Sequence, residues 1–253
     1  MSILSMRRSE RVIFPTAAMR DKAVEWASSL PEPCVIQYGF NRERFVEEDE
    51  EEELDVVRRV KGWREQGNVV LLYVSFYAVH KNFETLTDAL RLLKQKGWSV
   101  KLVTTTSRET TGDKEAHDRW QQRIDDHGLG DNIFEAGTIE HGKIHRLYRA
   151  SDLFVFPSFT ESFGHPMVEA MASGLPIVAA DTAVNREICG SAGAYHDTFD
   201  PASCAQAIER QMQAGDERAG LTDPKQRARE FSWQDHTRKL IETFRSLVEE
   251  ERT

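Results

Sequence analysis

Cysteine is scarce in this sequence, and long apolar runs are missing from it. The three cysteines, Cys34, Cys189 and Cys204, are odd in number and far apart, which indicates reduced thiols rather than a disulfide framework or a zinc site. No apolar run approaches the roughly 18 residues of a membrane-spanning helix. The first residues, MSILSMRRSERVIF, hold too short an apolar stretch for a signal peptide. We therefore expect a cytoplasmic protein.

Basic residues are in the minority as well. The chain has 33 Lys and Arg against 42 Asp and Glu, a formal net charge of -9, which argues against nucleic acid as the main partner. It contains no G-x-G-x-x-G, so a nicotinamide site has no support. The acidic run at 47–53 is most simply a solvated linker or a frayed helix start.

Two short motifs resemble ligand sites but are incomplete. Residues 137–143, GTIEHGK, fit the start of a P-loop, but Ile144 stands where Ser or Thr must hold magnesium. His141 and His145 have the i, i+4 spacing of a metal pair, but no third ligand is spaced to join them. We expect both histidines on a solvated helix face, and no metal site.

Short apolar runs alternate with helical segments along most of the chain. The runs VVLLYV and LFVF are continuously apolar, as in strands that are buried on both faces. Phe83, Leu86, Leu90 and Leu93 have helical spacing, and Gly97 follows them like a C-cap. The rhythm predicts an α/β fold with a doubly wound parallel sheet. The predicted strands are 11–14, 34–37, 69–75, 99–104, 132–136, 153–156 and 176–180, and the predicted helices are 83–96, 114–128, 141–151 and 166–173. Residues 202–212, 224–231 and 233–250 are predicted as helices that cover the sheet or its end.

The segment PSFTESFGHPMVEAMASGLPIVAAD follows the predicted strand LFVF. Ligands of open parallel sheets bind outside the carboxyl ends of the strands. Pro166 suits the first turn of a helix, where its missing N–H costs nothing. The free amides of Phe163, Gly164 and His165 would then point into the crevice and favour an anion such as phosphate, and Gly164 would let the ligand approach the backbone.

Two carboxylates flank this predicted anion site. Glu169 is in the first turn of the helix, off the buried stripe, and leans toward the helix N-terminus. A carboxylate accepts two hydrogen bonds side by side, which suits a vicinal diol such as ribose. Glu161, from the loop, would reach another sugar hydroxyl. The alternative is that Glu169 only complements the helix dipole and that Glu161 is a solvated loop residue.

The same segment resembles the signature of the group 1 (family 4) retaining glycosyltransferases, P-S-x-x-E-G-F-G-x-P-x-x-E-A-M-A-x-G-x-P-V-V-A. Glu161 and Glu169 stand at the two glutamates of its E-x7-E motif. VIQYGFNRERF, LLYVSFYAVHKNFETLTDAL, NIFEAGTIEHGKIHRLYRASDLFVFPS, EICGSAGAYHDTFDPASCAQAI and FSWQDHTRKLIETFRSL are similar to further family segments in the same order.

The resemblance implies a GT-B protein with two facing Rossmann-like domains and a nucleoside-diphosphate sugar as donor substrate. It implies that Glu169 binds the ribose, that Glu161 binds the transferred sugar, and that Lys81 with the amides of residues 163–165 holds the diphosphate. Thr138 lies in the segment that places the nucleobase, and Ser162 belongs to the donor loop. Glu161 and Lys81 would be the catalytic residues, and the resemblance implies neither a metal nor another cofactor.

Three departures from the family pattern concern the donor site. Ser75 and Phe76 stand where the family has Gly-Arg, so a phosphate-binding positive charge is missing. Ser162 replaces a glycine of E-G-F-G, and VTTTS at 103–107 replaces a segment that usually ends in glycine.

Residues 1–45 resemble the end of an acceptor-side domain and its connector, and residues 46–253 the nucleotide-sugar-binding domain. The sequence therefore predicts the donor-binding, C-terminal half of a retaining glycosyltransferase. Alternatives are a non-catalytic nucleotide-sugar-binding subunit, a nucleotide-sugar epimerase and a truncated, inactive product. The expected partners are a nucleotide sugar and either a separate acceptor-domain chain or a second copy, with membrane contact only through a partner.

Overall fold

The computed structural model describes residues 6, 8–27, 29–46, 54–214 and 223–250. All seven predicted strands are present, with ends that differ by up to two residues, and β8 (Gly193–His196) is an eighth that the sequence pattern did not indicate. The acidic run at 47–53 lies outside the described residues. The strands of the main sheet are β3 (Val69–Tyr73), β4 (Val100–Thr104), β5 (Ile133–Glu135), β6 (Leu153–Phe156), β7 (Ile177–Ala180) and β8.

The main sheet is doubly wound, as the sequence predicts. Its six strands are all parallel and lie in the order β5-β4-β3-β6-β7-β8. The chain therefore runs outward from β3 to β5, crosses back, and runs outward again from β6 to β8. The order reverses between β3 and β6, and ligands of such sheets bind at the carboxyl ends beside this reversal.

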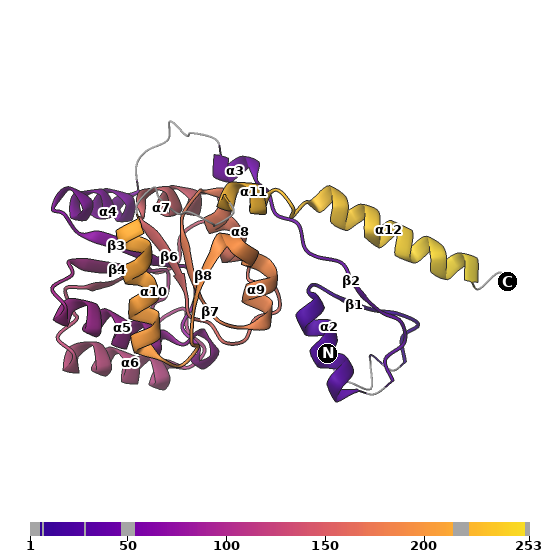
Figure 1. Cartoon of the computed structure of the whole chain (residues 1–253), viewed down its shortest axis with the longest axis horizontal. Coiled ribbons are helices and arrows are strands. Elements are labelled where there is room, and N and C mark those ends of the chain that lie inside the picture. The colour runs from indigo at the N-terminus through magenta and orange to yellow at the C-terminus, as the bar shows by residue number, and fades with distance from the viewer. Residues whose placement is uncertain (1–5, 7, 28, 47–53, 215–222, 251–253) are drawn as a thin grey trace.

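Helices cover both faces of the sheet (Figure 1). One face carries α5 (Phe83–Gln95), α6 (Lys114–Asp126) and α10 (Pro201–Ala214), and the other carries α4 (Asp55–Glu65), α7 (Ile144–Ala150), α8 (His165–Ala172), α9 (Ala183–Cys189) and α11 (Pro224–Ala228). Two short 3-10 turns, η1 (Val79–Lys81) and η2 (Gly190–Ala192), and the short helix α3 (Glu43–Val46) complete this part.

Helix α5 shows how the sequence pattern becomes packing. Phe83, Leu86, Leu90 and Leu93 are all at most 2% exposed. Each such side chain contributes about 1.5–3 kcal/mol by burial. Gly97 has a φ of 85°, the left-handed conformation of a residue just after a helix, as expected from its position.

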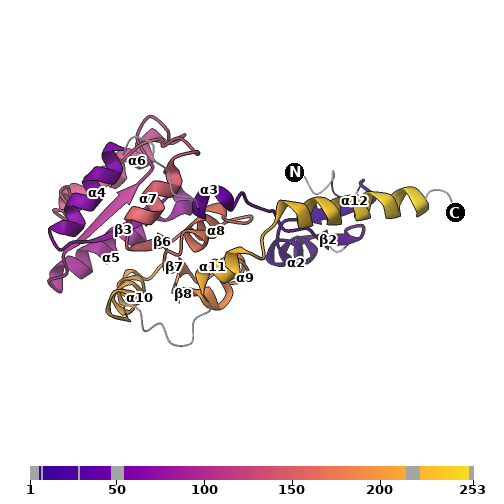
Figure 2. The same ribbon diagram turned by 90° about the horizontal axis from the view of Figure 1, so that it is seen from above.

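The N-terminal part forms a separate small sheet. β1 (Val12–Phe14) pairs in parallel with β2 (Pro33–Val35), and α2 (Ala17–Trp26) connects them. The last helix, α12 (Trp233–Glu250), lies beside this unit in both Figure 1 and Figure 2. Arg11 Nη1 donates a hydrogen bond to Ser246 Oγ at 2.8 Å across this contact.

The expectation that α12 covers the main sheet or its end is therefore wrong. The helix extends away from the sheet, and it leaves an apolar stripe exposed: Trp233, Ile241, Phe244 and Val248 are 45–56% exposed. Their spacing gives an amphipathic helix, but only the tertiary structure decides which surface such a stripe meets.

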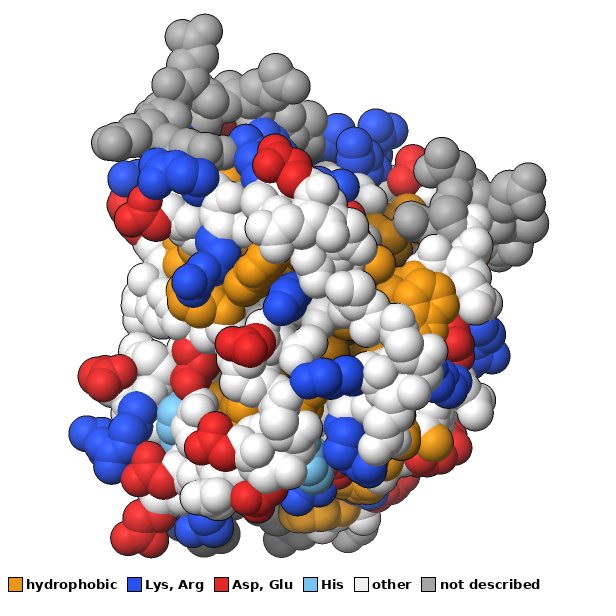
Figure 3. Space-filling model, turned by 90° about the vertical axis from the view of Figure 1, so that its left-hand side faces the viewer, with side chains coloured by type: hydrophobic (Ala, Val, Ile, Leu, Met, Phe, Trp, Pro, Cys, Tyr) orange, Lys and Arg blue, Asp and Glu red, His pale blue; other side chains and the backbone are white. Residues whose placement is uncertain are grey.

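The side of the molecule toward β4 and β5 is shown in Figure 3. Lys and Arg side chains are interspersed there with Asp and Glu around apolar patches, so neither sign of charge dominates this face. Among the described residues, no helix combines the length and apolar character that crossing a membrane requires.

Candidate functional site

A cleft of about 570 Å³ lies at the carboxyl ends of the strands, beside the reversal of strand order. Its walls come from the segment after β3, the loop after β4, the turn before α7, the N-terminus of α8 and the linker around Gly39. Four of the apolar residues that line it are Val74, Phe76, Ile139 and Ile144. The cleft therefore offers an apolar surface next to a helix N-terminus.

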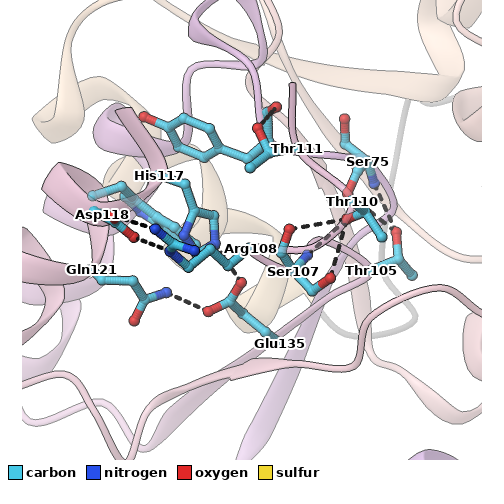
Figure 4. Close-up of polar contacts among 12 residues, drawn as sticks. Ser75, Thr105, Ser107, Arg108, Thr110, Thr111, His117, Asp118, Gln121 and Glu135 are labelled. Carbon is cyan, nitrogen blue, oxygen red and sulfur yellow. Dashed lines mark hydrogen bonds and ion pairs between the residues drawn. The ribbon is translucent and has the colours of Figure 1, made fainter. Parts of the chain in front are cut away.

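Threonines complete the apolar wall, because their hydroxyls are already engaged. Thr105 Oγ1 accepts a hydrogen bond from the Ser75 amide at 3.0 Å, and Thr110 Oγ1 accepts one from the Ser107 amide at 3.1 Å (Figure 4). The Thr110 hydroxyl also donates to the Ser107 carbonyl at 3.0 Å. Both threonines line the cleft. Such a wall suits the flat face of an aromatic ring.

The N-terminus of α8 is set by Gly164. This residue has a φ of 84°, and an added Cβ would lie 2.5 Å from Met167 Cε and close to the Phe156 ring. Glycine is therefore required here by conformation and by packing, in addition to any approach of a ligand. The helix begins at His165, whose amide has no acceptor within the helix. Pro166 has no N–H, and the Met167 amide donates to the Gly164 carbonyl at 3.0 Å.

Glu169 lines the cleft, but it is buried, with 8% exposure. The expectation that it lies off the buried stripe is wrong, because α7 packs over this side of α8. Its Oε2 accepts a hydrogen bond from the Tyr148 hydroxyl at 2.8 Å. Burial, and then the Glu169 charge, raise the pKa of Tyr148, which keeps this hydroxyl protonated as a donor. Tyr148 thus fixes the orientation of the carboxylate.

The other predicted binding residues divide into two groups. Thr138 and His165 line the cleft, and burial lowers the pKa of His165, which favours the neutral ring. Phe163 is 1% exposed, and Ser162 accepts a hydrogen bond from Thr16 Oγ1 through its carbonyl at 3.1 Å. The buried Phe163 can therefore serve a ligand only through its backbone, whereas Ser162 is exposed and neither residue lines the cleft.

Lys81 and Glu161, the predicted catalytic residues, are brought together from η1 and the loop after β6. Lys81 Nζ lies 2.6 Å from Glu161 Oε1, and both side chains are 12% exposed. Neither is among the residues that line the cleft. Phe76 lines the cleft and lies beside this pair, because its ring centroid is 5.5 Å from Lys81 Nζ. The pair therefore lies next to the cleft and is close to neutral as a unit.

Phe76 changes the electrostatics of the site. Its side chain is 51% exposed and lines the cleft where the family pattern has arginine. Of the described residues that line the cleft, none is Lys or Arg. The positive potential available to an anion therefore comes from the α8 N-terminus and from Lys81, which Glu161 already neutralises in part.

The two histidines of the 137–145 segment lie in different surroundings, so their placement on one solvated helix face is wrong. Helix α7 begins at Ile144, three residues later than predicted, and His141 belongs to the turn before it. His145 is 3% exposed and packs edge-on against Phe45 at 6.2 Å, whereas His141 lines the cleft. Within the described part of the chain, no three His, Cys, Asp or Glu side chains are grouped as a metal site requires.

Sequence reasoning missed two residues of this site, His141 and Tyr148. His141 was considered only as half of a metal pair. In the sequence, Tyr148 is indistinguishable from the other apolar residues of a short predicted helix. Its contact with Glu169 joins positions that are 21 residues apart. The spacing carried no signal for either role.

Comparison with known proteins identifies the family. The model of the family described as glycosyl transferases group 1 matches residues 55–229, and the chain belongs to this family. D-inositol 3-phosphate glycosyltransferase of Salinispora tropica is 40% identical over 113 residues, 42% of this chain and 23% of that protein. Mannosylfructose-phosphate synthase of Agrobacterium fabrum is 27% identical over 179 residues, 70% of this chain and 38% of that protein.

Solved structures share the fold of this chain. Sucrose-phosphate synthase of Thermosynechococcus elongatus has a TM-score of 0.80 and 21% identity, over 96% of this chain and 59% of that one. HepE of Anabaena in complex with UDP-glucose has a TM-score of 0.80 and 21% identity, over 96% of this chain and 65% of that one. The doubly wound α/β fold and the membership of the group 1 glycosyltransferases are thus confirmed. The matched region spans less than half of either curated relative.

Proposed function

We propose that this chain is the donor-binding half of a glycosyltransferase, which moves a sugar from a nucleoside diphosphate to an acceptor with retention of configuration. The observation that carries the proposal is the apolar cleft at the reversal of strand order, with the α8 N-terminus and Glu169 in its wall. The HepE structures with UDP and glucose, and with UDP-glucose, support a ligand of this class.

Each part of the cleft suits one part of such a donor. The wall of Val74, Ile139 and the two threonine methyl groups would take the nucleobase. Glu169 would accept hydrogen bonds from the ribose, and the amides at the start of α8 would hold the diphosphate.

In the reaction, the bond from the anomeric carbon to the diphosphate oxygen breaks, and a bond to an acceptor oxygen forms on the same face. The proton of the acceptor hydroxyl would pass to the oxygen of the leaving diphosphate. The leaving diphosphate gains negative charge, which the α8 N-terminus and Lys81 would stabilise. Glu161 would orient the sugar by accepting hydrogen bonds from its hydroxyls. When Glu161 takes these new partners in place of Lys81, the lysine would become free to bind the phosphate. The proposal involves no metal and no cofactor other than the donor substrate.

An acceptor-binding half would complete the enzyme. The apolar stripe of α12 is about half exposed, and an exposed patch of this kind marks an interaction surface. The two-stranded sheet of β1 and β2 is marginal as an isolated unit. We propose that a Rossmann-like acceptor domain, in the same polypeptide or as a separate chain, covers both. A binding subunit without turnover of its own is the second candidate, favoured by the lack of Lys and Arg among the described cleft residues.

The experiment that tests the proposal is thermal unfolding with UDP, GDP, ADP and their sugar conjugates. Ligand at about 100 times its dissociation constant adds roughly 2.7 kcal/mol, which raises the midpoint of a domain of this size by roughly 5–10 °C. Glu169→Gln, which keeps a hydrogen-bond acceptor for Tyr148, should lose most of the shift. A wild-type protein that no nucleotide stabilises would contradict the proposal.

Turnover separates the two candidates. The chain is mixed with an acceptor domain and a donor, and the anomeric configuration of any product is read by NMR. Retention supports the transferase, and an inverted product would refute that part of the proposal. Binding without turnover under the same conditions favours the subunit.

A further inference from the structure

His141 is the feature of the cleft that no role accounts for. It lies in the turn before α7, lines the cleft, and has a side chain that is 69% exposed. Its Nε2 lies 3.5 Å from Oε1 of Glu169. An exposed imidazole therefore faces Glu169, the one carboxylate among the described residues that line the cleft.

The two oxygens of Glu169 have different surroundings. Tyr148 donates to Oε2 from the protein interior, so the carboxylate cannot turn freely. Oε1 is the oxygen on the His141 side. The separation between His141 Nε2 and Glu169 Oε1 is longer than the distance of about 2.7–2.9 Å that is typical of charge-assisted hydrogen bonds. Each group therefore keeps the capacity to form a hydrogen bond with a ligand.

A hydroxyl group can contact both side chains from one side of the pair, since the 3.5 Å between Nε2 and Oε1 leaves no room directly between them. It donates its proton to a carboxylate oxygen and accepts a hydrogen bond from an imidazole N–H, so one hydroxyl satisfies both. A phosphate oxygen does not, because Glu169 would repel it. A metal ion would need further ligands, and no third His, Cys, Asp or Glu joins this pair within the described residues.

We propose that His141 is a specificity-determining residue that, with Glu169, holds a ribose hydroxyl of the bound nucleotide and discriminates ribose from deoxyribose. The inference rests on the proposed function, since it deepens the donor site. His141 donates through Nε2, Glu169 accepts through Oε1, and Tyr148 keeps the acceptor in place from behind.

The test compares binding of ribo- and deoxyribonucleotides by calorimetry. The probe is whichever of UDP, GDP and ADP binds the wild-type chain most tightly, together with its 2′-deoxy and 3′-deoxy forms. His141→Ala should weaken binding of the ribonucleotide by about threefold to tenfold, the worth of one hydrogen bond, and should lower the preference over one deoxy form by the same factor. His141→Gln, which retains an N–H donor, should keep most of the preference.

Lys143→Ala is the matched control. Lys143 is in the same turn, pairs with Glu140 at 3.4 Å and is not among the residues that line the cleft, so neither affinity nor preference should change. An unchanged ribose preference in His141→Ala would overturn the inference while leaving the donor site intact. A wild-type chain that binds no nucleoside diphosphate would overturn the proposed function and this inference with it.

Discussion

Replacing Phe76 by arginine should strengthen the proposed diphosphate site. Phe76 is 51% exposed and lines the cleft, so the substitution disturbs little packing. A charge-assisted hydrogen bond to the diphosphate is worth about 1.5–3 kcal/mol. At about 1.4 kcal/mol per factor of ten, the affinity for a nucleoside diphosphate should rise by about 10- to 150-fold.

Two local effects oppose this gain, and the pairing of Lys81 with Glu161 reduces the larger of them. Lys81 lies 5.5 Å from the Phe76 ring, and the loss of this cation–π contact costs about 0.5–1 kcal/mol at an exposed site. Repulsion between the new guanidinium and Lys81 would reach about 3 kcal/mol at this distance for an unpaired charge in a medium of effective dielectric constant about 20. Glu161 lies 2.6 Å from Lys81 and offsets most of it.

The assay is titration calorimetry with nucleoside diphosphates at low and high salt, beside Val79→Arg. Val79 is 63% exposed on η1 and is not among the cleft residues, so that variant adds the same net charge outside the cleft. We expect less than about a threefold gain for it, and a gain for Phe76→Arg that shrinks as salt rises. Equal gains for the two variants, or none for Phe76→Arg, would refute the assignment of Phe76 to the phosphate end of the site.

Three further outcomes follow from the contacts around the cleft. Gly164→Ala should lower the free energy of unfolding by about 1–3 kcal/mol in urea titrations, because its φ of 84° is strained for alanine and the new Cβ meets Met167. Tyr148→Phe should lower both nucleotide affinity and stability, the latter by about 1–3 kcal/mol, because Glu169 loses its fixed donor; unchanged calorimetric affinity would count against this. Burial lowers the pKa of His196 from 6.5, so below that pH the unfolded chain binds a proton that the folded chain does not. The stabilising contribution of the neutral ring is therefore present above about pH 6.5 and is lost as the pH falls. Between about pH 7.5 and pH 5.5, roughly the range in which a histidine titrates, His196→Asn should lose less stability than the wild type.

The main sheet was predictable because its strands are buried on both faces. A strand such as β6 reads as an unbroken apolar run, and α5 shows its apolar face at regular spacing. β8 lies at the sheet edge and reads Gly-Ala-Tyr-His, which has neither alternation nor a run. Helix α9 was missed although Thr182 caps it by accepting a hydrogen bond from Asn185, a signal that the sequence does contain.

The candidate site was only partly predictable, because a motif gives residues and the fold gives their partners. The spacing of Glu161 and Glu169 suggested two free carboxylates around one ligand. In the fold each has a partner from elsewhere in the chain: Lys81 for Glu161, 80 residues away, and Tyr148 for Glu169, 21 residues away.

These partners make the two carboxylates different in kind. Glu169 keeps its acceptor oxygens oriented by a neutral donor, so it can receive a ligand hydroxyl without losing its own contact. Glu161 is paired with a cation of equal burial, so a ligand that takes up one must separate it from the other. Breaking a partly buried ion pair is costly unless both members find new partners at once. A sugar phosphate supplies hydroxyls for the carboxylate and an anion for the lysine in one molecule, whereas a free sugar or a free phosphate supplies only one of the two. In the proposed function, the pair would therefore favour the intact donor over either of its parts.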